Sequence, residues 1–90
     1  MTREDPGLAR AERIVTLAAD YLDRYPQQQA LMDEPILRDA LRAVQNPILR
    51  EVRPRSSQSL VRALVRSMLP PISGTVGEYA RRLRARAAHE

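Results

Sequence analysis

The sequence predicts an all-α fold, a small bundle of four to five short helices. Apolar residues recur at helical spacing along most of the chain, and no stretch alternates apolar and polar residues as a strand would. Capping residues or prolines stand at the start of most of these periodic segments. The core must be built from aliphatic side chains, because the chain of 90 residues has no Phe, no Trp and only 3 Tyr. Such side chains suit helix-on-helix packing.

The length is that of one small domain. We expect residues 1–7 to form a disordered N-terminal lead, because they are charged and contain Pro6-Gly7, and residues 8–90 to form a single helical domain. The absence of cysteine excludes disulfides and thiolate metal sites. No segment offers the roughly 20 apolar residues that span a bilayer, and no signal peptide is apparent. We therefore expect a cytoplasmic protein without membrane association.

The first helix is expected from residue 8 to about residue 25. Pro26 should end it, because proline disfavours the helical conformation in the residue before it. Asp20 and Arg24 are spaced to form an exposed ion pair on the polar side. The apolar stripe consists of Leu8, Ala11, Ile14, Val15, Ala18, Tyr21, Leu22 and Tyr25.

The second helix should start at Asp33 or Glu34, with Pro35 in its first turn, and run to Asn46. Pro47 then leaves two alternatives, a new short helix over residues 47–52 or a kinked continuation. We favour a kink or a tight break of one or two residues. The expected buried face consists of Ile36, Leu37, Ala40, Leu41, Ala43 and Val44.

The third helix, over residues 57–69, carries large aliphatic side chains on one half of its helical wheel. An apolar face this wide predicts contact with several neighbours. We therefore expect it to be the core helix, shared by the first, second and last helices, with Arg62 and Arg66 at its edge. Its apolar residues are Leu60, Val61, Leu64, Val65, Met68 and Leu69, and its candidate caps are Ser56, Ser57 and Ser59.

The last helix follows an extended connector that begins at Pro70-Pro71. Thr75 and Glu78 have the spacing of a capping box, which predicts a helix from there to about Ala88. Its apolar stripe is narrow and is surrounded by arginines. The stripe consists of Val76, Tyr79, Ala80, Leu83 and Ala87, and the arginines are Arg81, Arg82, Arg84 and Arg86.

The charge is divided unevenly along the chain. Residues 1–46 hold six Arg and eight acidic residues, a net charge of −2, and residues 47–90 hold nine Arg and three acidic residues, a net charge of +6. Together they make the formal net charge of +4. A basic second half predicts an acidic partner, which is a protein surface, nucleic acid or, less favoured, an anionic membrane, although an arginine-rich solvated face explains the same distribution.

Residues suited to catalysis or metal binding are scarce. The only histidine, His89, stands next to the end of the sequence, where no partner would orient it. Asp20 and Asp23 are close enough on a helix to share a cation, but without a third ligand a solvated face explains them better. We therefore expect no enzyme activity, no metal site and no cofactor.

The function predicted is that of a small regulatory or adaptor protein that binds another protein. An inhibitor or antiactivator of a larger regulator, or a dedicated chaperone, would fit, and so would a homodimer. Tyr21 and Tyr25 suit an interface, but burial in the bundle explains them better. The predicted contact surface consists of Arg62, Arg66, Tyr79, Arg81, Arg82, Leu83, Arg84 and Arg86.

The alternative is a DNA-binding accessory factor that uses the basic second half. Residues 57–69 occupy the place of a recognition helix, with Ser57, Gln58 and Arg62 near its start. Pro54 in the preceding turn and the apolar character of the helix argue against that motif. Basic charge is the only physical support for this alternative.

Overall fold

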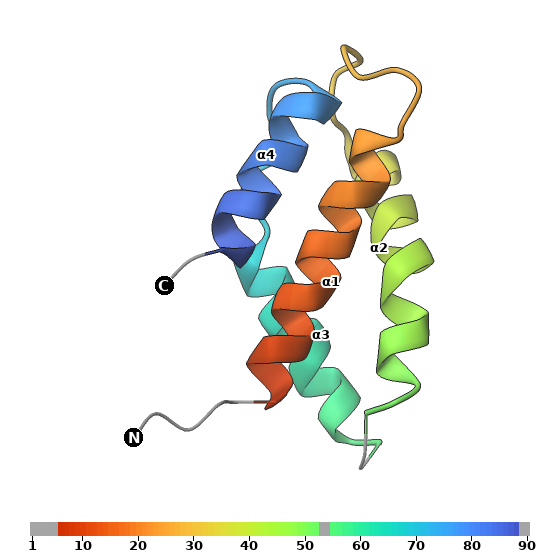
Figure 1. The fold of residues 1–90 in the computed structure, drawn as a ribbon, viewed down its shortest axis with the longest axis vertical. Helices are drawn as coiled ribbons and strands as arrows, with labels where there is room; N and C mark the ends of the chain where they lie inside the picture. Colours follow the sequence, from red (N-terminus) through yellow and green to blue (C-terminus); the bar gives the residue numbers. More distant parts are fainter. Residues whose placement is uncertain (1–5, 53–54, 89–90) are drawn as a thin grey trace.

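The computed structural model describes residues 6–52 and 55–88, and this part of the chain is an all-α bundle of four helices (Figure 1). The predicted fold class is confirmed. The only strand-like pairing in the described ranges is one isolated bridge between Leu31 and Thr75. The helices are α1 (Pro6–Asp23), α2 (Glu34–Leu49), α3 (Ser57–Met68) and α4 (Val76–Ala87). None of them is long and apolar enough to cross a membrane.

The central helix is α1, and the prediction that residues 57–69 form the core helix is wrong. Helix α1 packs against each of the other three, most extensively against α4, as Figure 1 shows in outline. Its inward side is fully buried, and half of that side is alanine, which lets neighbouring helices approach closely. The fully buried residues are Ala11, Ile14, Val15, Ala18, Ala19 and Leu22.

Helix α3 lies at the periphery and packs against α1 and, to a smaller extent, α4. Only Val61 and Val65 of this helix are buried, whereas Leu64 is half-buried and Leu60 is 56% exposed. Ser56 stands at the N-cap position but makes no capping hydrogen bond with its side chain. The apolar face of α3 is therefore wider than the part of the helix that the neighbouring helices bury.

The start of α1 lies two residues earlier than predicted. Pro6 and Gly7, assigned from the sequence to a disordered lead, belong to the helix. Proline suits the first turn of a helix, where its missing N–H would have no partner in any case. The remainder of the predicted lead, residues 1–5, lies outside the described residues.

Helix α2 starts as predicted and runs through Pro47 without a break. The side chain of Asp33 accepts a hydrogen bond from the Ile36 amide at 2.9 Å. Pro47 and Ala43 are both exposed, so water can satisfy the Ala43 carbonyl that a proline cannot bond. Ala43, expected on the buried face, therefore lies on the solvent side. Of the alternatives at Pro47, the continuation occurs, and neither a break nor a separate short helix does.

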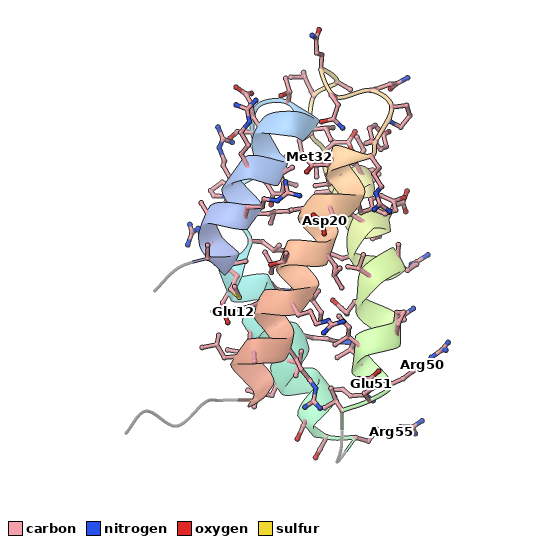
Figure 2. All side chains as sticks on the ribbon, in the orientation of Figure 1. Glu12, Asp20, Met32, Arg50, Glu51 and Arg55 are labelled. Carbon is pink, nitrogen blue, oxygen red and sulfur yellow. The ribbon has the colours of Figure 1, made fainter. Side chains whose placement is uncertain are left out.

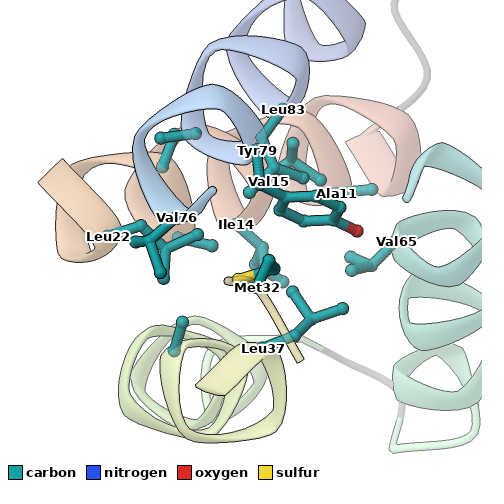
Figure 3. Packing of buried hydrophobic residues seen from close by; sticks show 14 of the residues in the cluster. Ala11, Ile14, Val15, Leu22, Met32, Leu37, Val65, Val76, Tyr79 and Leu83 are labelled. Carbon is teal, nitrogen blue, oxygen red and sulfur yellow. The ribbon is translucent and has the colours of Figure 1, made fainter. Parts of the chain in front are cut away.

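The loop between α1 and α2 is hydrogen-bonded to the start of α4. The amide of Met32 donates to the Gly74 carbonyl at 3.0 Å, and the amide of Val76 donates to the Ala30 carbonyl at 2.9 Å. Met32 is buried between the helices (Figure 3). Gly74 has φ of 74°, and a Cβ at this position would approach the Glu78 Oε1 atom to 2.5 Å. A left-handed residue with no side chain is therefore required at Gly74.

Helix α4 begins with the predicted capping box. The Thr75 hydroxyl accepts a hydrogen bond from the Glu78 amide at 3.2 Å, and the Glu78 carboxylate accepts one from the Thr75 amide at 2.9 Å. The narrow apolar stripe of α4 faces α1. Four of its members are buried, Val76, Tyr79, Ala80 and Leu83. Figure 3 labels Val76, Tyr79 and Leu83 in the core.

Candidate functional site

Two of the eight residues predicted to contact a partner lie in the core. Tyr79 and Leu83 are fully buried against α1. The Tyr79 hydroxyl donates a hydrogen bond to the Pro70 carbonyl at 2.7 Å. Burial raises the pKa of this phenol, and the positive charge of Arg82 opposes the rise. Both residues hold the bundle together and offer no surface to a partner, so the prediction that they belong to the contact surface is wrong.

A third predicted contact residue, Arg84, is engaged within the bundle. Its guanidinium bridges the carboxylates of Asp20 and Asp23, each at 2.5 Å. Partial burial would lower the pKa of Arg84, but the hydrogen bonds and charges of the two carboxylates outweigh it and raise the pKa. The cation that Asp20 and Asp23 share is therefore the side chain of Arg84. The predicted pairing of Asp20 with Arg24 is replaced by this bridge between α1 and α4.

Arg82 is exposed, but its position is constrained. Its Nη1 atom donates to the carbonyl and to the hydroxyl of Ser73, at 2.9 Å and 2.6 Å. The remaining N–H groups of the guanidinium have no hydrogen-bond acceptor among the described residues. Arg82 is thus oriented by the connector before α4 while it keeps donors available for a ligand.

The other four predicted arginines are exposed. Within residues 6–52 and 55–88, no ion pair or hydrogen bond involves the side chains of Arg62, Arg66, Arg81 and Arg86. Arg62 and Arg66 lie one turn apart on α3. Arg86 lies one turn beyond Arg82 on α4, so these two side chains share one side of that helix.

Arg82 and Arg86 border an open groove of about 720 Å³, which we call the arginine groove. The groove lies between the first half of α1, the end of α3 with the prolines that follow it, and the second half of α4. Arg62 and Arg66 do not line it. Its lining residues are Leu8, Glu12, Ser67, Met68, Pro70, Pro71, Arg82, Ala85 and Arg86.

The arginine groove combines an apolar lining with a basic border. Leu8 is 40% exposed and Met68 is half-buried, so both offer apolar surface to a ligand. The charged groups of the lining are two guanidinium groups and one carboxylate, that of Glu12. Such a groove can bind apolar groups by removing them from water and carboxylates through charge-assisted hydrogen bonds.

The described residues contain no group of three or more His, Cys, Asp or Glu side chains that could hold a metal ion. His89 lies outside the described residues. Comparison of the chain with protein-family models, with curated proteins and with solved structures gives no match.

The apolar part of the arginine groove was not predicted from the sequence. Leu8 and Met68 belong to apolar stripes that were assigned to the core, and each stands at the end of its helix. An apolar residue near the end of a helix is covered by fewer neighbouring residues than one in the middle. This position in the sequence is the signal that could have identified Leu8 and Met68 as surface residues. The Pro70-Pro71 pair was interpreted only as a connector.

Proposed function

We propose that the protein is a non-catalytic regulatory or adaptor protein of the cytoplasm, and that it acts by binding another protein. The partner segment docks in the arginine groove and carries apolar side chains together with Asp or Glu. The observation that carries this proposal is the apolar groove bordered by Arg82 and Arg86.

The composition of the groove supports a protein partner. Met, Arg and aromatic residues are enriched at the centres of interfaces, and the groove offers one Met and two Arg. The two prolines cannot rearrange freely, so little conformational entropy is lost when a ligand covers them. Ser73 also restricts Arg82 before binding, which lowers the cost of ordering its side chain.

The test is a charge reversal inside the groove with a matched reversal outside it. The variant Arg82→Glu/Arg86→Glu alters the groove, and Arg62→Glu/Arg66→Glu makes the same change in charge on α3. The tagged chain and both variants are used to capture proteins from extracts of the producing cells, and affinities are then measured with the purified partner. Circular dichroism checks that both variants keep their helices.

We expect the wild type and the α3 variant to bind the same partner, and the groove variant to bind it at least tenfold more weakly. Each lost charge-assisted hydrogen bond costs about 1.5–3 kcal/mol, which accounts for this factor. Unchanged affinity of a folded groove variant overturns the proposal. A second copy of the chain as the bound protein would make the groove a homodimer interface.

DNA binding remains the alternative, and one observation favours it. Helix α3 is peripheral, and its outer face exposes Arg62 and Arg66 together with Ser59 and Ala63. Gln58, a candidate for base contacts, instead donates its side-chain amide to the Leu49 carbonyl at 2.8 Å.

Binding to unrelated duplex DNA at low and at moderate salt separates the two functions. Affinity that falls steeply with salt and is lost in Arg62→Glu/Arg66→Glu would support the DNA-binding function, because phosphate contacts release counterions. Absence of binding at low salt rejects it.

A further inference from the structure

A second concave surface follows the contact between α1 and α2, and we call it the α1–α2 seam. It consists of two adjoining hollows of about 430 and 450 Å³. Leu17 and Val44 line both hollows, so the two are continuous. Tyr21 and Tyr25 line the first hollow, and Arg13 lines the second.

The α1–α2 seam and the arginine groove lie on different sides of α1. At 100° per residue, the residues of α1 that line the two surfaces are centred about 150° apart around the helix. Figure 2 shows Glu12, a groove residue, on the side of α1 away from α2, and Glu51, a seam residue, below α2. One ligand in each surface could therefore be accommodated at the same time.

The seam presents aromatic and aliphatic surface. Tyr21 is 37% exposed, and Tyr25 is half-buried two residues after the end of α1. Val44 is half-buried on the facing side, from α2. Tyrosine side chains that are apolar in body and partly solvated are typical anchors of protein interfaces.

The charge along the seam selects an acidic ligand. Arg10 and Arg13 line one end and Arg24 lines the other, and none of the three takes part in an ion pair within the described ranges. Asp20 also lines the seam, but its carboxylate is bonded to Arg84. Glu51 is the remaining carboxylate of the lining, so both ends of the seam are basic on balance.

The same charges disfavour a second copy of the chain as the occupant. Two copies that joined seam to seam in antiparallel fashion would place Arg24 of each near Arg10 and Arg13 of the other. A parallel arrangement would place like ends together. Either arrangement brings guanidinium groups of like charge into contact, which raises the free energy of the pair.

The spacing of the hollows fits a helix. The residues of α1 that line the two hollows are centred about six residues apart, which is roughly 9 Å along a helix axis. Two turns of a bound helix cover roughly the same distance, so side chains at i and i+7 would enter the two hollows.

We propose that the α1–α2 seam binds an amphipathic helix of a second protein, with apolar anchors two turns apart and Asp or Glu near both of its ends. The protein would then bridge two partners, one on each side of α1. Binding at the seam does not depend on the arginine groove, because different residues carry it, whereas the bridging role also rests on the proposed function of that groove.

The probe is a synthetic helical peptide of about 18 residues, with Leu at positions that present an i, i+3, i+7 stripe and Glu in its first and last turns. A matched peptide has Lys in place of every Glu. Each peptide is titrated into the full chain, and binding is followed by the backbone amide signals in nuclear magnetic resonance.

We expect the Glu peptide to shift the amide signals of Leu17, Tyr21 and Val44 in a saturable manner, and the Lys peptide to bind at least tenfold more weakly. The variant Arg13→Glu/Arg24→Glu should weaken binding of the Glu peptide at least tenfold. The milder variant, Arg13→Gln/Arg24→Gln, should weaken it several-fold. Arg82→Glu/Arg86→Glu should bind the peptide as the wild type does.

Four results would overturn the proposal. The first is equal affinity for the two peptides, and the second is no saturable shift at millimolar peptide. The third is a set of shifts that map to Ala85 and Arg86 instead of the seam. The fourth is dimerisation of the chain through the seam in sedimentation experiments. If the Arg82→Glu/Arg86→Glu variant bound the captured partner as tightly as the wild type, the proposed function would be rejected, but the peptide results would not change. The two proposals can therefore be rejected separately.

Discussion

The four arginines of α4 are chemically identical, but their neighbours give them different roles. Arg84 is bonded to two carboxylates of α1, and Arg82 is bonded to Ser73 at the edge of the arginine groove. Arg81 and Arg86 are exposed. The sequence indicated a basic helix, but it could not distinguish a structural arginine from an available one, because Asp20 and Ser73 are brought close only by the fold.

The buried hydroxyl of Tyr79 allows a prediction of how much one buried polar group contributes to the free energy of unfolding. Replacing Tyr79 with Phe keeps the ring but leaves the Pro70 carbonyl without the hydroxyl that bonds it at 2.7 Å. We expect the free energy of unfolding to fall by about 1–3 kcal/mol, because a buried acceptor loses its partner. Chemical denaturation monitored by circular dichroism measures this change.

The matched control for that substitution is Tyr21→Phe. Tyr21 is exposed and its hydroxyl has no hydrogen bond within the described part of the chain. The control should therefore change the free energy of unfolding very little. Equal losses for the two substitutions would show that the Tyr79 hydroxyl does not contribute as a buried group.

At the scale of elements, local signals located the helices well and the loops poorly. The caps at Asp33 and Thr75 were readable from the sequence, because each depends on residues at most three positions apart. The hydrogen bonds from Met32 to Gly74 and from Val76 to Ala30 join loops that are distant in sequence. No local pattern reports such a pairing, which joins the start of α4 to the loop between α1 and α2.

The capping box of α4 makes a prediction about pH. The hydrogen bond from the Thr75 amide is the main reason that the pKa of Glu78 lies below its ordinary value of 4.5, and the hydroxyl of Thr75 and the nearby Arg82 and Arg81 lower it further. The folded state therefore favours the carboxylate. This contribution to stability is present above pH 4.5 and is lost as the pH falls through the lowered pKa.

The measurement compares the wild type with Glu78→Gln by urea denaturation between pH 6 and pH 3. The wild type should be the more stable protein at pH 6, and the difference between the two should shrink as the pH is lowered. A difference that stays constant over this range would show that the Glu78 charge does not stabilise the start of α4.

At the scale of the whole molecule, the position of α1 decides which surfaces are available. A central α1 contacts α2, α3 and α4, and both grooves are formed where it meets its neighbours. The width of the apolar stripe on a helix did not predict which helix lies at the centre of the bundle. The alanines on the inner side of α1 allow close packing from three directions, whereas Leu60 on α3 is 56% exposed.

The sequence itself shows that charge is distributed unevenly along the chain, but it does not show where the fold places the charged side chains. Arginines from both halves of the sequence line the two grooves, because Arg10, Arg13 and Arg24 come from the half with the net negative charge. The carboxylates of Asp20 and Asp23 are occupied by Arg84, so they do not offset the basic surface at the seam.

The central claim is that α1, and not α3, forms the core around which both grooves are built. The most direct test compares the free energies of unfolding of Ile14→Ala and Leu64→Ala. Ile14 is fully buried, so its truncation should cost about 2–5 kcal/mol, enough to unfold a domain of marginal stability. Leu64 is half-buried, so its truncation should cost about 1–2 kcal/mol. A larger loss for Leu64→Ala than for Ile14→Ala would contradict the claim.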